Sequence, residues 1–151
     1  MSIRGQKAPE FSAITTRGET FTLSAHQGKV VVLFFFPAAF SPLCTREVAE
    51  FAKAWRDFAD LGAEVVGISL DDQKTQCEFA AAESLPYALV SDPQAQIAKL
   101  YEAKWPAIAR IRRITYVIDP DRIVRNIFRY ELRPALHATG ALDSLKDLRR
   151  T

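Results

Sequence analysis

The chain contains the segment VVVLFFF at residues 30–36, followed at once by PAAFSPLC at residues 37–44. Seven consecutive apolar residues, rich in β-branched and aromatic types, are typical of a strand that is buried on both faces. Pro37 lacks the backbone donor that a sheet requires, and Pro42 has a backbone angle suited to the first turn of a helix. The segment therefore predicts a central strand, then a loop, then a helix that begins around residues 41–44.

This arrangement places Cys44 in the first turn of the predicted helix. Free backbone N–H groups and the positive end of the helix dipole favour the thiolate there, which is the nucleophilic form of cysteine. The hydroxyl of Ser41 is placed to donate to the sulfur or to a bound substrate, and the ring of Pro37 is placed to cover the sulfur against water. We therefore expect Cys44 to be a nucleophile.

The composition predicts one globular domain that spans residues 1–151, because 48% of the residues are hydrophobic. A net charge of +2 gives no reason to expect a nucleic acid or an anionic membrane as partner. The N-terminal residues lack the apolar core of a signal peptide, and no apolar run is long enough to span a bilayer, so we expect a soluble, cytoplasmic protein. Two cysteines and two distant histidines, with no Cys-x-x-Cys pair, make a disulfide scaffold or a zinc site improbable.

Hydrophobic periodicity and turn residues predict the remaining elements. A hairpin is expected at residues 11–15 and 20–23 around Gly18, and the helix after Cys44 should run to about residue 61 with Trp55 in its core face. His26 falls in a polar connection and is expected to be a solvated loop residue. Further strands are predicted at residues 63–69, 87–91, 114–118 and 123–130, and further helices at residues 73–83, 92–101 and 135–148.

Strands that alternate with helices indicate a mainly parallel sheet, and the hairpins add antiparallel strands. The expected fold is an α/β three-layer sandwich with a central mixed sheet and an N-terminal hairpin. In such folds sites form where strands end and helices begin, and Cys44 lies at such a junction.

At this point the chain resembles the peroxiredoxins. The segment from Pro37 through Ser41 to Cys44 is similar to the family pattern Pro-x-x-x-Thr/Ser-x-x-Cys, and RITYVID at residues 113–119 is similar to its Arg-x-Thr-Phe-x-Ile-Asp strand. The segments APEF at residues 8–11 and GISLD at residues 67–71 also match in order. The resemblance covers nearly the whole chain, and its nearest subgroup is the bacterioferritin-comigratory or Q-type peroxiredoxins.

The resemblance implies a thioredoxin-like fold and a thiol-dependent peroxidase without metal, haem or flavin. It makes Cys44 the peroxidatic cysteine, with Pro37, Ser41 and Arg113 as its partners and Glu47 bonded to the arginine. Hydrogen peroxide and organic hydroperoxides would be reduced through a cysteine sulfenic acid, with electrons from thioredoxin or a similar thiol. A monomer or a weak homodimer is expected.

Two positions depart from the family pattern. Ser41 replaces the more usual threonine, which keeps the hydroxyl and loses a methyl group. Ala49 occupies the position where many Q-type members carry a resolving cysteine. Cys77 is the other thiol and lies about one helical turn before Ala80, near where some relatives place that cysteine.

Two interpretations of Cys77 stay open. As the resolving cysteine it would need local unwinding, because a disulfide requires Cα atoms within roughly 7 Å. Alternatively, Cys77 is a small apolar side chain in the core, and an external thiol reduces the sulfenic acid.

The sequence also leaves alternatives for other residues and for the function. Arg110 and Arg112 compete with Arg113, although neighbours on a strand point to opposite faces, and Glu47 could be an ordinary charge on a helix surface. A cysteine hydrolase would need His137 as its base, yet the terminal helix gives no reason for it to face Cys44. A disulfide exchanger would need a second cysteine where Glu47 stands, and a redox sensor or holdase on the same fold would show little turnover.

Overall fold

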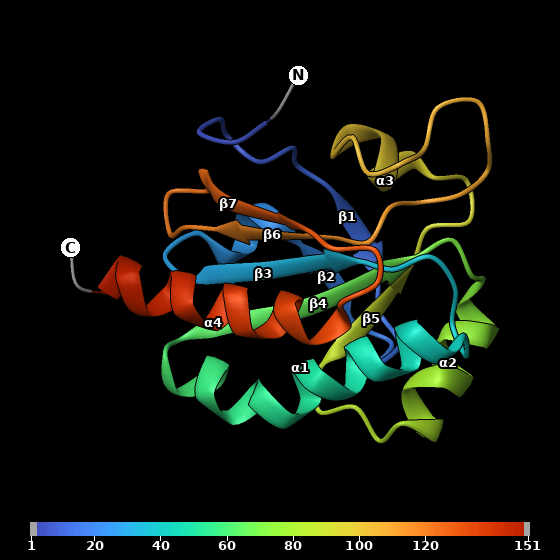
Figure 1. The fold of residues 1–151 in the computed structure, drawn as a ribbon. Helices are drawn as coiled ribbons and strands as arrows, with labels where there is room; N and C mark the ends of the chain where they lie inside the picture. The colour runs from blue at the N-terminus through green and yellow to red at the C-terminus, as the bar shows by residue number, and fades with distance from the viewer. Residues whose placement is uncertain (1–2, 150–151) are drawn as a thin grey trace.

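A five-stranded mixed sheet forms the centre of the computed structural model, which describes residues 3–149 (Figure 1). Its strand order is β5-β4-β3-β6-β7. β4 is parallel to β3 and to β5, whereas β6 is antiparallel to both β3 and β7. The strands are β3 (Val30–Phe35), β4 (Ala63–Ser69), β5 (Ala88–Ser91), β6 (Ile114–Ile118) and β7 (Val124–Arg129).

β3 is the central strand because its side chains are apolar on both faces. Phe34 stacks on Phe51 of the first helix at 4.2 Å between ring centroids, while the next residue, Phe35, contacts Tyr101 and Tyr116 on the opposite face. Each face therefore carries its own buried cluster. The prediction of a doubly buried strand at this position is confirmed.

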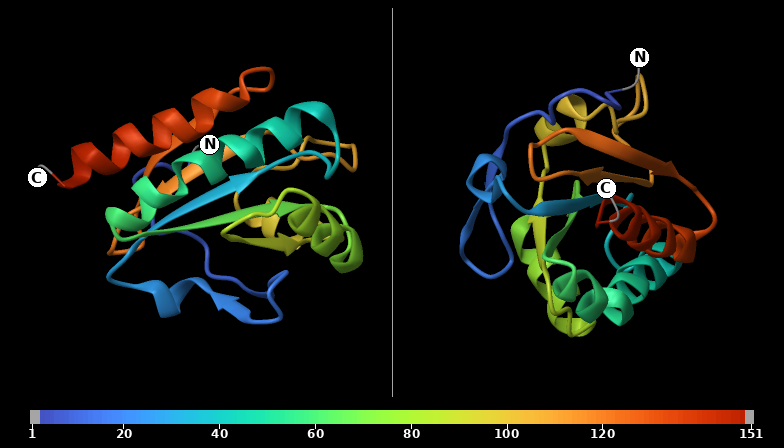
Figure 2. Two further views of the ribbon diagram at one scale, coloured as in Figure 1. Left: turned by 90° about the horizontal axis from the view of Figure 1, so that it is seen from below. Right: turned by 90° about the vertical axis from the view of Figure 1, so that its left-hand side faces the viewer.

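The fold has three layers, and the sheet that contains this strand is the middle one (Figure 2). Helices α1 (Pro42–Asp60) and α4 (Pro134–Arg149) pack together on one face of the sheet. The opposite face carries the hairpin of β1 (Ser12–Ile14) and β2 (Thr20–Thr22), the short helix η1 (Leu23–His26), and α3 (Gln96–Leu100). Helix α2 (Gln73–Ala82) lies beside β5 at the edge of the sheet.

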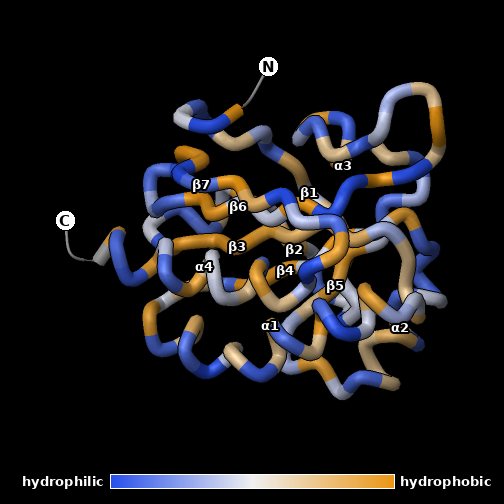
Figure 3. Tube along the Cα trace, viewed as in Figure 1, coloured by the Kyte–Doolittle hydropathy of each residue, from blue (hydrophilic) through white to orange (hydrophobic). Residues whose placement is uncertain are grey.

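The hydropathy of the chain follows these layers. In Figure 3 the tube is hydrophobic along the central strands, while hydrophobic and hydrophilic segments alternate along α1. The structure thus confirms the predicted α/β sandwich with its mixed sheet and N-terminal hairpin. In residues 3–149 no helix combines the length and the apolar character that a membrane crossing requires.

One expectation for a single residue is wrong. His26 is half buried, because its ring stacks on Phe21 at 4.5 Å between centroids and its Nδ1 lies 3.0 Å from the carbonyl oxygen of Thr22. Trp55 is half buried and packs against the core cluster on this face of the sheet, as its place in the helical pattern predicts. His26 belongs to a partly covered surface, which its polar sequence context does not distinguish from a solvated loop.

Gly67 is required where β4 passes the ring of Phe34. A Cβ atom at this position would lie 2.6 Å from Cζ of Phe34 and 2.7 Å from Cδ2 of Leu89. We therefore expect Gly67→Ala to lower the free energy of unfolding by about 1–3 kcal/mol, because the packed core must shift to admit a methyl group. Urea unfolding measures this loss.

A double-mutant cycle with Phe34→Leu provides the control. The smaller side chain makes room for the new methyl group, so the two costs should sum to more than the cost of the double variant. Strict additivity, or an unchanged stability of Gly67→Ala, would contradict the close packing described here.

Candidate active site

Cys44 lies in the first turn of α1, two residues after Pro42 opens the helix. Ser41 precedes the helix in an extended conformation, with φ −71° and ψ 150°. The side chain of Cys44 is fully buried at the base of this turn. The sequence prediction of its local setting is therefore confirmed.

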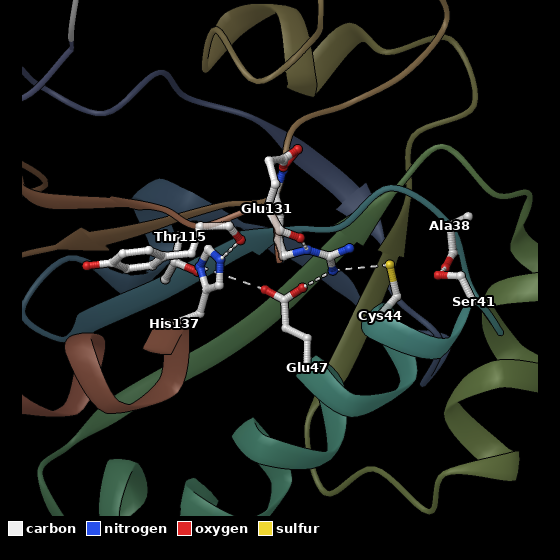
Figure 4. Close-up of polar contacts among 9 residues, drawn as sticks. Ala38, Ser41, Cys44, Glu47, Thr115, Glu131 and His137 are labelled. Atoms are coloured by element: carbon white, nitrogen blue, oxygen red, sulfur yellow. Dashed lines mark hydrogen bonds and ion pairs between the residues drawn. The ribbon is translucent and has the colours of Figure 1, made fainter. Parts of the chain in front are cut away.

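The sheet register brings Arg113 to the same place. Phe35, the last residue of β3, pairs with Ile114, the first residue of the antiparallel strand β6. Arg113 directly precedes β6, so it lies beside the loop through which the chain leaves β3 for α1. Its Nη1 atom donates to Sγ of Cys44 at 3.3 Å (Figure 4).

The guanidinium of Arg113 is held from several sides. Nη1 also donates to Oε1 of Glu47 at 2.7 Å, and Nε donates to the carbonyl oxygen of Glu131 at 2.9 Å. The carboxylate of Glu131 accepts from the backbone N–H of Arg113 at 2.9 Å. Burial lowers the pKa of Arg113, but attraction to Glu47 and the hydrogen bonds outweigh this effect and leave the pKa raised. Arg113 is therefore a fixed buried cation, only 5% exposed.

Glu47 is fully buried one turn after Cys44, so it is not a surface charge. Burial raises the pKa of its carboxyl to about 8, although Arg113 opposes this rise. Its second oxygen, Oε2, has no hydrogen-bond partner within the described part of the chain. Glu47 thus presents one satisfied and one unsatisfied oxygen to the interior.

His137 also belongs to this cluster, contrary to the expectation that the terminal helix would not direct it toward the site. It is fully buried on α4, and its Nδ1 atom lies 3.8 Å from Oε2 of Glu47. Nδ1 also lies 2.7 Å from Oγ1 of Thr115, and Nε2 lies 2.8 Å from the carbonyl oxygen of Tyr130. Burial lowers the pKa of His137 to about 4. Because both ring nitrogens have these partners and Glu47 stands before it, His137 is not placed as a base for Cys44.

The loop before Cys44 is tied to the end of β4. Oδ2 of Asp71 accepts from the backbone N–H of Ala39 at 2.7 Å and from the hydroxyl of Ser69 at 2.6 Å. The hydroxyl of Ser41 donates to the carbonyl oxygen of Ala38 at 2.7 Å and not to the sulfur. The loop is thus held by the carboxylate of Asp71 and by a hydrogen bond within the loop itself.

A cavity of about 560 Å³ opens beside the loop. Pro37, Ser41 and Arg113 line it together with Arg110 and several apolar side chains. The neighbouring Arg112 does not line this cavity, and its guanidinium carbon lies 4.4 Å from the ring centroid of Trp105. Of the three candidate arginines, Arg113 is the one that donates to the sulfur.

Cys77 lies on α2, outside this cluster, and both cysteines are free thiols. Its sulfur lies 3.6 Å from Nε2 of Gln73 and 3.9 Å from the carbonyl oxygen of Thr16. No group of three or more His, Cys, Asp or Glu side chains in residues 3–149 is arranged to hold a metal ion. The site itself places one buried sulfur beside a cation.

Sequence reasoning missed Glu131 and placed His137 away from the site. The buried positions of α4 include Pro134, His137, Ala138, Ala141, Ser144 and Leu145. This helical spacing would have placed His137 on the packed face. No comparable signal exists for Glu131, because it lies between β7 and α4 and its contacts depend on the folded chain.

Comparison with known proteins agrees with the geometry. Residues 4–127 match the model of the AhpC/TSA family. Peroxiredoxin Bcp of Bacillus subtilis is 32% identical over 95% of this chain and 95% of its own length. The crystal structure of peroxidoxin BcpB from Mycobacterium tuberculosis superposes with a TM-score of 0.91 at 33% identity, covering 99% of both chains.

A further similar structure comes from trapped intermediate/ligand complexes of the Xanthomonas campestris bacterioferritin comigratory protein, which were solved to explain its alkyl peroxide reduction activity. It superposes with a TM-score of 0.84 at 27% identity over 91% of each chain.

The buried carboxyl of Glu47 should make stability depend on pH. Its pKa rises from an ordinary value of 4.5 to about 8 on folding, so its contribution to stability is complete below about pH 4.5 and is lost as the pH rises toward 8. We expect Glu47→Gln to flatten the stability curve over this range by at least about 1 kcal/mol. Urea unfolding between these pH values measures the effect.

Glu50→Gln is the matched control on the same helix, because Glu50 is only partly covered and pairs loosely with Lys53 at 3.8 Å. It should leave the pH dependence of the wild-type protein unchanged. An equal change in both variants would mean that burial of Glu47 is not the cause.

Proposed function

Because this chain belongs to the AhpC/TSA family and is a thiol-dependent peroxidase, we propose that Cys44 is its peroxidatic cysteine and that Arg113 is the catalytic cation beside it. The observation that carries this assignment is the hydrogen bond from Nη1 of Arg113 to Sγ of Cys44 at 3.3 Å. A guanidinium that donates to sulfur stabilises the thiolate, and the first turn of α1 adds its backbone N–H groups.

The reaction transfers two electrons from sulfur to the peroxide. The thiolate of Cys44 attacks the terminal oxygen in line with the O–O bond, an S–O bond forms, and the O–O bond breaks. The products are a sulfenic acid on Cys44 and a hydroxide or alkoxide that takes up a proton to give water or an alcohol. Negative charge moves from sulfur to the leaving oxygen, so a fixed cation on that line lowers the barrier.

Supporting roles fall to three further residues. Glu47 orients the guanidinium of Arg113 through their 2.7 Å contact. Pro37 and Ser41 line the cavity beside the loop, where a ring limits water and a hydroxyl is available to the substrate. A small rotation about the Ser41 side chain would exchange its present bond to Ala38 for one to a bound peroxide.

Hydrogen peroxide and organic hydroperoxides are the proposed substrates. Pro37, Pro42, Leu43 and Ala109 give the neighbouring cavity an apolar lining that suits an alkyl group. The alkyl peroxide activity named for the Xanthomonas campestris protein supports this choice.

We further propose that Cys77 resolves the sulfenic acid of Cys44, and that thioredoxin or a similar thiol then reduces the protein. Helix α2 borders the active-site loop, because Phe79 of α2 packs against Phe40 at 5.0 Å and Phe36 at 5.9 Å between ring centroids. Cys77 and Cys44 have separate contacts in the folded state, so a disulfide requires unwinding at the start of α1 or in α2. A cytoplasmic location and a monomeric or weakly dimeric state remain predictions.

Removal of the catalytic cation tests the main assignment. We expect Arg113→Met to slow the reaction of Cys44 with hydrogen peroxide by about a hundredfold to a thousandfold, because the developing charge on the leaving oxygen loses its fixed donor. The measurement is the single-turnover rate of thiol loss under stopped flow. Arg112→Met is the control, since Arg112 stacks on Trp105 and should react at the wild-type rate; equal rates for wild type and Arg113→Met would contradict the assignment.

Mass spectrometry after one equivalent of peroxide tests resolution. If Cys77 resolves Cys44, the wild-type protein loses two hydrogens, and Cys77→Ser instead gains one oxygen. A stable gain of oxygen in the wild-type protein would show that an external thiol completes the cycle. Peroxide consumption over many turnovers with thioredoxin and its reductase distinguishes an enzyme of this kind from a slowly oxidised sensor or holdase.

A further inference from the structure

Two buried titratable side chains face one another where α1 meets α4. Glu47 stands between Arg113 and His137, with one carboxylate oxygen directed to each (Figure 4). Glu47 and His137 are both fully buried. In the proposed mechanism Glu47 orients Arg113, whereas His137 has no role.

Hydrogen-bond accounting locates one proton on the imidazole. The carbonyl oxygen of Tyr130 only accepts, so Nε2 of His137 carries a proton and donates to it at 2.8 Å. Nδ1 faces the hydroxyl of Thr115 at 2.7 Å and Oε2 of Glu47 at 3.8 Å. The hydroxyl both donates and accepts, so it fits Nδ1 with or without a proton.

Oε2 of Glu47 lacks a donor among residues 3–149. A buried carboxylate oxygen without a donor costs free energy, and an anionic Glu47 opposite a bare Nδ1 would place two acceptors face to face. One added proton on Oε2 or on Nδ1 removes the uncompensated negative charge, and at 3.8 Å the two groups interact through their charges and not through a hydrogen bond. The added proton makes either a neutral carboxylic acid beside a neutral imidazole or a carboxylate beside an imidazolium.

The charge of the surroundings depends on that proton. The other titratable or charged groups around the pair are Cys44, Arg113, Glu131, Tyr130 and Tyr87. With one proton the pair has no net charge, so Arg113 is the cation opposite the sulfur. Without it, the carboxylate of Glu47 would compete with the Cys44 thiolate for the same guanidinium.

We propose that His137 is a positioning residue that shares one proton with Glu47 and so keeps the charge of Arg113 available to Cys44. This role rests on the proposed function of Cys44. The raised pKa of Glu47, about 8, and the lowered pKa of His137, about 4, agree with a pair that holds one proton between these values. The pair loses this proton as the pH rises through about 8, and a second is taken up only near pH 4.

Proton NMR of the imidazole rings tests the shared proton directly, because the chain has only two histidines. His137→Gln assigns the signals, and His26, on η1 across the sheet, serves as the internal reference. We expect the chemical shifts of the His137 ring protons to change near pH 8, and this change should disappear in Glu47→Gln. The His26 signals should be the same in both proteins. A change that persists in Glu47→Gln, or no change in the wild-type protein, would overturn the proposal.

The same titration in Cys44→Ser separates this proposal from the proposed function. The change in the His137 signals should persist there, because it belongs to Glu47 and not to the thiol. Loss of peroxide reactivity in Cys44→Ser tests the peroxidatic role independently. If Cys44→Ser kept its peroxide reactivity, the proposed function would fail while the NMR result for the pair would stand.

The pH profile of Cys44 oxidation tests the effect on the sulfur. In the wild-type protein the single-turnover rate should decline above about pH 8, and Glu47→Gln should remove that decline. His137→Leu should move the midpoint by more than about half a pH unit, because Glu47 then holds the proton alone. His26→Leu should keep the wild-type midpoint, and an unmoved midpoint in His137→Leu would contradict a positioning role.

Discussion

The contact of one guanidinium with a sulfur and a carboxyl group organises this molecule. Arg113 is a buried cation, and a buried cation is tolerated only when its donors have partners. Cys44 and Glu47 supply two of them from α1, and the carbonyl oxygen of Glu131 supplies a third from the segment before α4, while the carboxylate of Glu131 accepts from the backbone N–H of Arg113. Three parts of the chain must therefore be docked correctly before this charge is satisfied, which links the integrity of the fold to the reactivity of the sulfur.

The pairing of strands in the sheet brings Arg113 next to Cys44. β3 and β6 are antiparallel neighbours, so the residue just before β6 always lies next to the point where the chain leaves β3 for α1. Apolar side chains on both faces of β3 fix that register, because a shift by one residue would turn its aromatic rings to the wrong side. The hydrophobic core thereby sets the position of the polar site.

Much of this arrangement was predictable from sequence. The apolar run at residues 30–36 and the two prolines identify β3, the loop and the start of α1, and β4 agrees with its predicted bounds. The contact between Arg113 and Cys44 was expected only through a family pattern. The inward positions of Glu131 and His137, and the bond from Ser41 to Ala38, depend on how α4 and the loop pack, which local propensity does not encode.

Asp71 and Asp72 connect the loop before Cys44 to helix α2. The carboxylate of Asp71 anchors the backbone at Ala39, and the adjacent Asp72 caps α2 by accepting from the N–H of Thr75. The loop before Cys44 and the helix that carries Cys77 are thus held by two consecutive residues. If Cys77 approaches Cys44 in the proposed resolution step, that movement acts on the residues that hold the loop beside the proposed substrate cavity.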